Sequence, residues 1–284
     1  MPFAQARHAR IYFEEHGAGY PIIFVHELAA DCREWESQVQ WFSRSYRCIT
    51  FNARGYPPSE VPADAALYGH DYAADDIAAV LDHLQIGRAH VVGLSMGAYA
   101  TLNFGIRHPG RASALVVAGV GSGSPPDERE EFIRHSLVMA RRFRDEGSAV
   151  MASEMGHSPT RIQLKRKDPP GWNKFMEHLR EHDSAGMAYT LSMVQGQRPS
   201  LEDFSTQLAA LAVPVLLAVG DEDAPCVRTN LWLKNVLPDA GLWMAPKTGH
   251  AINLEEPAAF NAQVQQFLSQ VERRQTGAAT ERQP

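Results

Sequence analysis

A serine held between two glycines is the residue of this sequence best suited to nucleophilic chemistry. The segment Gly93-Leu94-Ser95-Met96-Gly97 follows a short apolar run at 90–92 and precedes helix-like content from residue 98. Strand, tight turn and helix in this order are typical of a serine whose hydroxyl is exposed on a strained turn. The amide of Met96, at the start of the helix, could then donate a hydrogen bond to a developing negative oxygen. The alternative is a chance match in an ordinary loop.

A serine hydroxyl is a weak nucleophile near neutral pH, so it needs a base and a group that orients the base. His250 is the candidate base because it follows an apolar strand expected at 241–245 and its side chain titrates near neutral pH. The loop after the strand expected at 211–219 provides three carboxylates, Asp221, Glu222 and Asp223. A carboxylate in this place could fix the imidazole and offset its positive charge in the transition state.

Apolar runs alternate with helical patterns along most of the chain. The expected strands lie at 9–15, 22–25, 46–51, 90–92, 115–120, 211–219 and 241–245. Alternation of this kind predicts an α/β fold with a mostly parallel, doubly wound sheet and helices on both faces.

One long segment breaks this alternation. Between residues 124 and 205 the strand-like runs disappear and charged, methionine-rich helical segments replace them. This change predicts a helical cap inserted before the later strands. We therefore expect a core formed by residues 1–123 and 206–272, a cap at 124–205, and a disordered polar tail at 273–284.

These features together resemble the α/β-hydrolase superfamily, in its capped branch of esterases and carbon–carbon bond hydrolases with a serine nucleophile. Three motifs follow one another in the superfamily's order of serine, acid and histidine. The matching segments are Gly-x-Ser95-x-Gly, Gly220-Asp221-Glu222-Asp223, Gly249-His250 and, earlier in the chain, Arg54-Gly55 with Ser59. The resemblance extends over nearly the full length of the chain.

The resemblance implies a role for each candidate residue. Ser95 would be the nucleophile, His250 the base and Asp223 the acid, with Asp221 as the fallback for the acid. The backbone amides of Met96 and Leu28 would bind the oxyanion.

Two positions depart from the superfamily's pattern. Glycine usually follows the histidine after the second apolar strand, but here His26 is followed by Glu27. Glu27 could point to solvent, which we slightly favour, or face the pocket and position water or a polar substrate group. His26 is expected to hydrogen-bond within its loop rather than to catalyse. Asn52 replaces the usual aspartate before Arg54, for which we expect a structural ion pair.

The cap contributes a further set of candidates. Trp172 and the cap methionines are expected to pack the interior of the cap itself. Some of them, together with His26 and Glu27, could also line an apolar substrate pocket between the cap and the sheet.

Composition excludes several classes of partner. The 284 residues carry a net charge of −6, which provides no basic surface for nucleic acid, and no apolar run approaches a membrane span. Cys32, Cys48 and Cys226 form no metal or disulfide pattern, so we expect buried free thiols in a cytoplasmic protein. The resemblance implies a small-molecule substrate and no metal or organic cofactor. No feature indicates an oligomeric state.

These features predict a serine hydrolase that cleaves a small ester, lactone or thioester through an acyl-enzyme intermediate. A carbon–carbon bond hydrolase with the same triad is an alternative. A small-molecule receptor with vestigial turnover is another, because Glu27 departs from the hydrolase pattern. Ser95 argues against epoxide opening and halide displacement, which would require aspartate at the nucleophile position. Ala251, where hydroxynitrile lyases have lysine, argues against that activity.

Overall fold

The structure is a computed structural model that describes residues 1–280, with the side chains of residues 1–275. This part of the chain forms one eight-stranded sheet with the order β1-β2-β4-β3-β5-β6-β7-β8. Its strands are β1 Phe3–Ala6, β2 Ala9–His16, β3 Tyr20–Val25, β4 Tyr46–Phe51, β5 Ala89–Leu94, β6 Ala112–Ala118, β7 Val215–Gly220 and β8 Ala240–Ala245. The two pairs that contain β2 are antiparallel, and all other neighbours are parallel.

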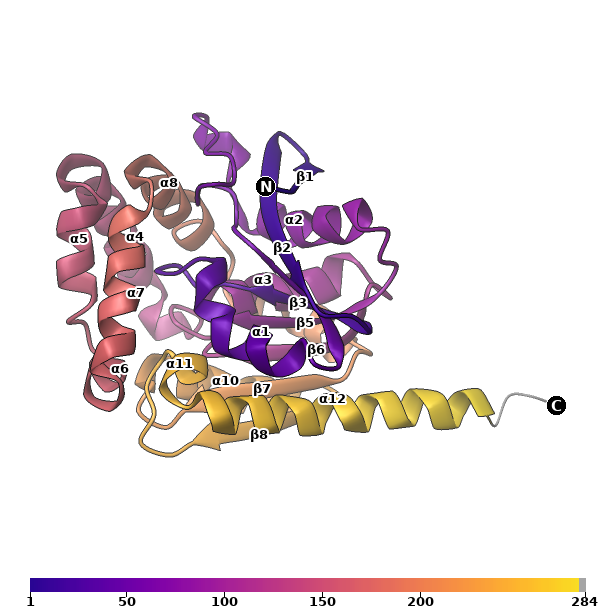
Figure 1. The fold of residues 1–284 in the computed structure, drawn as a ribbon. Helices are drawn as coiled ribbons and strands as arrows, with labels where there is room; N and C mark the ends of the chain where they lie inside the picture. The colour runs from indigo at the N-terminus through magenta and orange to yellow at the C-terminus, as the bar shows by residue number, and fades with distance from the viewer. Residues whose placement is uncertain (281–284) are drawn as a thin grey trace.

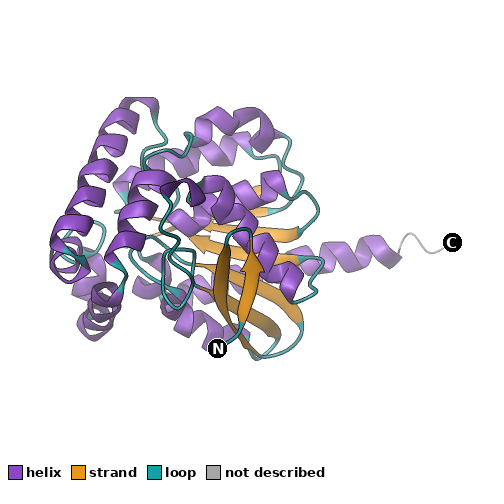
Figure 2. Cartoon of the chain, turned by 90° about the horizontal axis from the view of Figure 1, so that it is seen from above, coloured by secondary structure: helices purple, strands orange, loops and turns teal. Residues whose placement is uncertain are grey.

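The parallel strands are buried because their sequences are apolar on both faces. Every residue of β5, β6 and β7 is buried. The helices α2 (His70–His83), α3 (Met96–Arg107) and α10 (Ala224–Val236) pack on one face of the sheet. The helices α1 (Glu36–Phe42) and α12 (Pro257–Thr280) pack on the other, so that the sheet lies between two layers (Figures 1 and 2). This arrangement confirms the mostly parallel, doubly wound sheet predicted from the sequence.

The segment between β6 and β7 carries helices that gather at one end of the sheet (Figure 1). They are α4 Pro126–Glu146, α5 Ser148–Met155, α6 Ile162–Lys167, α7 Pro169–Glu181, α8 Ser184–Tyr189 and η3 Thr190–Gln195, after which η4 Leu201–Phe204 and α9 Ser205–Ala209 lead back to β7. Their apolar side chains form a separate cluster that includes Met139, Phe143 and Phe175. The same cluster takes in Met96, the first residue of α3, and Ala251, from the loop after β8. The cap therefore covers the carboxyl ends of the parallel strands.

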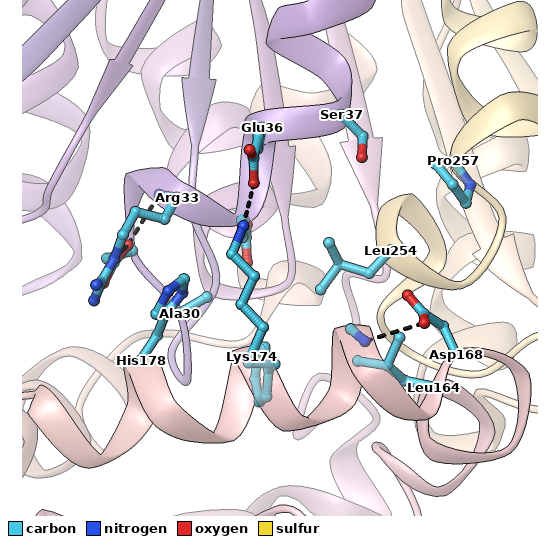
Figure 3. Close-up of a pocket in the computed structure, with 14 residues that line it drawn as sticks. Ala30, Arg33, Glu36, Ser37, Leu164, Asp168, Lys174, His178, Leu254 and Pro257 are labelled. Carbon is cyan, nitrogen blue, oxygen red and sulfur yellow. Dashed lines mark hydrogen bonds and ion pairs between the residues drawn. The ribbon is translucent and has the colours of Figure 1, made fainter.

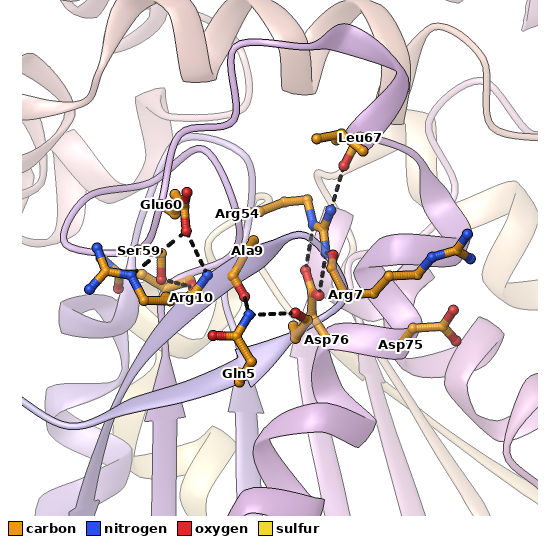
Figure 4. Close-up of polar contacts among 12 residues, drawn as sticks. Gln5, Arg7, Ala9, Arg10, Arg54, Ser59, Glu60, Leu67, Asp75 and Asp76 are labelled. Carbon is orange, nitrogen blue, oxygen red and sulfur yellow. Dashed lines mark hydrogen bonds and ion pairs between the residues drawn. The ribbon is translucent and has the colours of Figure 1, made fainter.

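Arg54 anchors the loop after β4 to the edge of the sheet (Figure 4). Its guanidinium is buried and makes two hydrogen bonds with Asp76 of α2, at 2.8 and 2.6 Å. It also donates to the carbonyl oxygens of Leu67 and Arg7. These contacts give Arg54 a structural role, as we expected from the sequence.

The last helix is longer than the sequence indicated. We expected a disordered tail from residue 273, but α12 continues to Thr280, and residues 281–284 lie outside the described residues. The physical reason is that residues 273–280 contain no proline and include arginine, glutamine and alanine, which favour helix. Neither α12 nor any other helix within residues 1–280 combines the length and the apolar character needed to cross a bilayer.

Gly97 allows α3 to begin directly against the end of β3. A Cβ added at this position would lie 2.1 Å from the carbonyl oxygen of Val25 and 2.6 Å from that of His26. Gly97→Ala should therefore lower the free energy of unfolding by about 1–3 kcal/mol, because backbone atoms of the sheet would have to move. Urea unfolding measures the loss. Gly87→Ala is the matched control, since a Cβ there meets no atom within 4 Å. Equal losses in the two variants would contradict this account.

Candidate active site

Ser95 lies on the turn between β5 and α3. Its φ of 54° and ψ of −112° belong to a region that residues with side chains rarely adopt. Glycine makes the turn possible, because a Cβ at Gly93 would lie 2.4 Å from the carbonyl oxygen of Gly97. The Ser95 amide donates to the carbonyl oxygen of Ala118 at 2.8 Å, which ties the turn to β6. The serine therefore sits on the strained, tightly packed turn that the motif requires.

His250 and Asp223 meet between two loops that follow adjacent strands. His250 Nδ1 lies 2.8 Å from Asp223 Oδ2, and both side chains are buried. The loops run in contact because a Cβ at Gly220, the last residue of β7, would lie 2.2 Å from the carbonyl oxygen of Thr248. Asp221, the alternative acid, does not face the imidazole. It accepts a hydrogen bond from the Thr248 amide at 3.1 Å and so holds the two loops together.

Two residues that the sequence analysis did not select hold His250 in place. The buried carboxylate of Glu255 accepts hydrogen bonds from the amides of Gly249 and Ala251, at 2.6 and 3.2 Å. It thereby fixes the backbone on both sides of the histidine. The thiol of Cys226 lies 3.9 Å from His250 Nδ1 and packs against the same nitrogen as Asp223.

His250 and Asp223 set each other's protonation. Burial alone would lower the pKa of His250, but the charge and hydrogen bond of Asp223, with Cys226 nearby, raise that pKa well above its usual value. Burial alone would raise the pKa of Asp223, but the charge and hydrogen bond of His250 lower it. With its pKa raised, His250 becomes a neutral base only at a higher pH than an ordinary histidine would.

The loop after β3 is held by hydrogen bonds from both sides. His26 Nε2 accepts from the Ala53 amide at 2.9 Å, so Nδ1 carries the proton and donates to the carbonyl oxygen of Glu27 at 2.7 Å. Burial lowers the pKa of His26 to about 4, which keeps the ring neutral. The Tyr56 hydroxyl donates to the carbonyl oxygen of Leu28 at 2.8 Å. His26 thus serves the structure of the loop, which is the role that we expected.

Met96 and Leu28 come from segments that are in close contact. Met96 is the first residue of α3, so its amide has no acceptor within the helix. The approach of Gly97 to the end of β3 brings this helix start against the loop that carries Leu28. Two amides can donate hydrogen bonds to the same oxyanion only if the segments that carry them lie this close together.

Glu27 does not point to solvent, and the interpretation that we slightly favoured from the sequence is wrong. Its side chain is 1% exposed, and its Oε2 forms an ion pair with Nη2 of Arg161. The same oxygen lies 3.9 Å from His250 Nε2. The reason is electrostatic, because the cap supplies a guanidinium that compensates the buried carboxylate. Glu27 is thereby placed next to the imidazole nitrogen that does not face Asp223.

A second carboxyl group and an aromatic ring complete this cluster. Glu34 Oε1 accepts a hydrogen bond from the Glu27 amide at 3.2 Å, and the Arg161 guanidinium lies over the ring of Phe175. Burial, together with the Glu27 charge, raises the pKa of Glu34 well above its usual value. Glu27 Oε1 and Glu34 Oε2 are buried without a hydrogen-bond partner among the described residues.

A cavity of about 720 Å³ lies between the cap and the core next to these residues. Phe132 and Met139 of α4 and Met155 of α5 provide its apolar lining. Thr160 and Pro225 also line it, and they directly precede Arg161 and Cys226. The cavity therefore reaches the sequence neighbours of Arg161 and Cys226, while Ser95 and His250 themselves do not line it.

A smaller cavity, of about 190 Å³, follows the boundary between α1 and α7 (Figure 3). Lys174 of α7 forms an ion pair with Glu36 of α1 across it, and Glu34 lies in its wall. Here a charged pair joins cap and core beside apolar contacts that include Leu164 and Leu254.

Trp172 is remote from this site and lines neither cavity. Its Nε1 donates to the carbonyl oxygen of Gly156 at 2.8 Å, and its ring packs against His157. Trp172 helps to fill the interior of the cap. No contact in the described part of the chain supports the expectation that it lines a substrate pocket.

Both the sequence and the fold are similar to hydrolases over almost the whole chain. The family described as alpha/beta hydrolase fold matches residues 20–257. A putative carbamate hydrolase from Caulobacter sp. (strain K31) is 29% identical over 274 residues, which cover 91% of this chain and 96% of that protein. A 2-hydroxymuconate semialdehyde hydrolase from Pseudomonas sp. (strain CF600) is 27% identical, with coverages of 93% and 92%. A solved thermophilic esterase from Thermogutta terrifontis has a TM-score of 0.83 at 25% identity, with coverages of 93% and 94%.

Arg161→Met should destabilise the protein strongly, because it leaves the Glu27 carboxylate buried without a partner. Removing one member of a buried pair costs about 3–5 kcal/mol, and the double variant Glu27→Gln/Arg161→Met should regain most of this. Urea unfolding gives the free energies. Arg142→Met, which removes a partly exposed cap arginine paired with Glu146, should cost at most about 1 kcal/mol. If Arg161→Met lowers the free energy of unfolding no more than this control does, Arg161 does not compensate a buried Glu27 charge.

Proposed function

We propose that this chain, which belongs to the α/β hydrolase fold family as the sequence predicted, is a serine hydrolase with Ser95, His250 and Asp223 as its triad. The observation that carries the proposal is the buried 2.8 Å contact of His250 Nδ1 with Asp223 Oδ2. It lies at the same end of the sheet as the strained Ser95 turn. The substrate is a small carbonyl compound such as an ester, lactone or thioester.

In the first half of the reaction Ser95 Oγ attacks the carbonyl carbon, and His250 Nε2 takes the hydroxyl proton. Asp223 holds the imidazole through Nδ1 and offsets the charge that forms on it. The amides of Met96 and Leu28 donate to the oxyanion of the tetrahedral intermediate. As the intermediate collapses, His250 passes its proton to the leaving group, and the acyl group stays on Ser95.

In the second half water replaces the leaving group. His250 takes a proton from the water while the water oxygen attacks the acyl carbon, and the resulting oxyanion occupies the same two amides. Collapse returns the proton from His250 to Ser95 Oγ and releases the carboxylic acid. Each half-reaction therefore needs a neutral His250 at its start.

The cavity next to the cap supports a substrate with an apolar part. Its volume of about 720 Å³ lies in the range usual for small-molecule sites, and Phe132, Met139 and Met155 are among its apolar walls. We place the acyl or leaving-group chain of the substrate there. This assignment gives the cap a role in selecting substrates.

A carbon–carbon bond hydrolase is the second candidate, favoured by the similarity to the 2-hydroxymuconate semialdehyde hydrolase. The same serine would then attack a ketone, and His250 would protonate the departing carbon. Incubation with a panel of esters, lactones and β-diketones, followed by mass spectrometry of the products, distinguishes the two. Cleavage of β-diketones with no turnover of esters would favour the second candidate.

The setting that we propose is cytoplasmic, with a small molecule as the only partner required. Cys32, Cys48 and Cys226 are buried free thiols, which suits a reducing compartment. The net charge of −6 gives no reason to expect binding to nucleic acid.

Ser95→Ala should lower kcat for an activated ester such as 4-nitrophenyl acetate by about a thousandfold or more, because no other group replaces the nucleophile. Release of 4-nitrophenol, measured by absorbance, provides the rate. Ser153→Ala, at an exposed position of α5, is the control and should retain full turnover. Turnover in Ser95→Ala close to that of the control would refute the assignment of the nucleophile.

The pH dependence of kcat/KM should report the raised pKa of His250. Three side chains face the imidazole, namely Asp223, Cys226 and Glu27, the last in its pair with Arg161. Because the pKa of His250 is raised, kcat/KM should increase with pH through a midpoint above about 6.5, the usual value for histidine. Asp223→Asn should move the midpoint down as well as lower the rate. A wild-type midpoint at or below 6.5 would be inconsistent with this account.

A further inference from the structure

Glu27 places a buried hydrogen-bond acceptor beside His250, on the side of the imidazole that does not face Asp223. Its Oε2 pairs with Arg161 and lies 3.9 Å from His250 Nε2, while its Oε1 is buried without a partner among the described residues. A buried acceptor without a donor is energetically unfavourable, so a ligand that brings a donor gains from it. Both oxygens belong to one carboxylate, so such a donor would lie close to His250 Nε2.

The space next to His250 Nε2 is the place of the leaving group, because this nitrogen delivers the proton when the bond to the leaving atom breaks. The leaving oxygen of an ester has only lone pairs to present, and a carboxylate repels them. The leaving nitrogen of an amide of the type R–CO–NH–R′ carries a hydrogen that a carboxylate accepts. The acceptor therefore favours nitrogen over oxygen in the leaving position.

Arg161 determines which oxygen of the Glu27 carboxylate can accept a further hydrogen bond. The guanidinium binds Oε2 and compensates the negative charge, which would otherwise oppose the oxyanion that forms nearby. It also leaves Oε1 as the free acceptor. Arg161 itself is 4% exposed and belongs to the cap, so the acceptor is in place only when the cap is docked.

We propose that Glu27 is a specificity-determining residue that selects amides bearing an N–H over the matching esters. The proposal rests on the proposed function, since it uses the leaving-group side of the Ser95–His250 pair. In the step concerned, the C–N bond of the tetrahedral intermediate breaks and the proton on His250 Nε2 passes to nitrogen. The amine departs and the acyl group remains on Ser95. Glu27 accepts a hydrogen bond from the N–H and exchanges no proton.

The test compares kcat/KM for 4-nitrophenyl acetate and 4-nitroacetanilide, which differ only in oxygen against N–H at the leaving position. In Glu27→Gln, Arg161 attracts the side-chain oxygen, so the NH₂ group takes the place of Oε1 and presents a donor. The anilide-to-ester ratio should then fall about ten- to a hundredfold. Glu146→Gln, at an exposed position of α4, is the control and should leave the ratio unchanged.

Two results would overturn the proposal and leave the hydrolase intact. One is wild-type protein that cleaves the ester but not the anilide, and the other is the same ratio in Glu27→Gln as in wild type. If Glu27→Gln does not fold, N-methyl-4-nitroacetanilide decides, because it lacks the N–H and wild type should cleave it at least about tenfold more slowly. Equal rates for the two anilides would overturn the proposal. Retention of both activities in Ser95→Ala would instead contradict the proposed function.

Discussion

The charges at the candidate active site are buried, and each depends on a partner for its stability there. Asp223 and His250 form one pair, and Glu27 and Arg161 form the other. An isolated ion in such a place would be strongly unfavourable, whereas a compensated pair is tolerated. Because His250 Nε2 also lies 3.9 Å from Glu27, the two pairs form one electrostatic unit. Its members come from the loops after β3, β7 and β8 and from the cap, so the unit exists only in the assembled fold.

The backbone makes this assembly possible through a few close approaches. Gly97 lets α3 begin against the end of β3, and Gly220 lets the acid and histidine loops run in contact. Glu255 then fixes the backbone on both sides of His250. The fold therefore brings Asp223, His250 and Glu27 together, and the cap completes the electrostatic balance by contributing Arg161.

The sequence predicted the parts of the site that are fixed by local structure. Ser95 was identified because glycines at 93 and 97 are required by its turn, and His250 because its loop follows an apolar strand. The choice between Asp221 and Asp223 rested on the resemblance, and only the structure shows that Asp221 binds the Thr248 amide. The doubly wound sheet was predictable as well, because strands buried on both faces leave continuous apolar runs. For the sheet, the pattern of apolar residues in the sequence agrees with the tertiary structure.

What the sequence did not reveal depends on contacts between distant segments. Glu27 was expected in solvent because its charge would be repelled from a site that must stabilise an anion, and its partner Arg161 is 134 positions away. Nothing in the sequence distinguishes Arg161 from the other basic residues of the cap. Its role follows from how the cap packs on the loop after β3.

The measurement that tests the central claim most directly is the position at which a fluorophosphonate reacts, determined by tandem mass spectrometry of the digested protein. Our account predicts a single adduct on Ser95, with a rate that falls sharply in His250→Ala because the base is gone. A modified serine elsewhere with Ser95 free, or the same rate of labelling in His250→Ala, would contradict it.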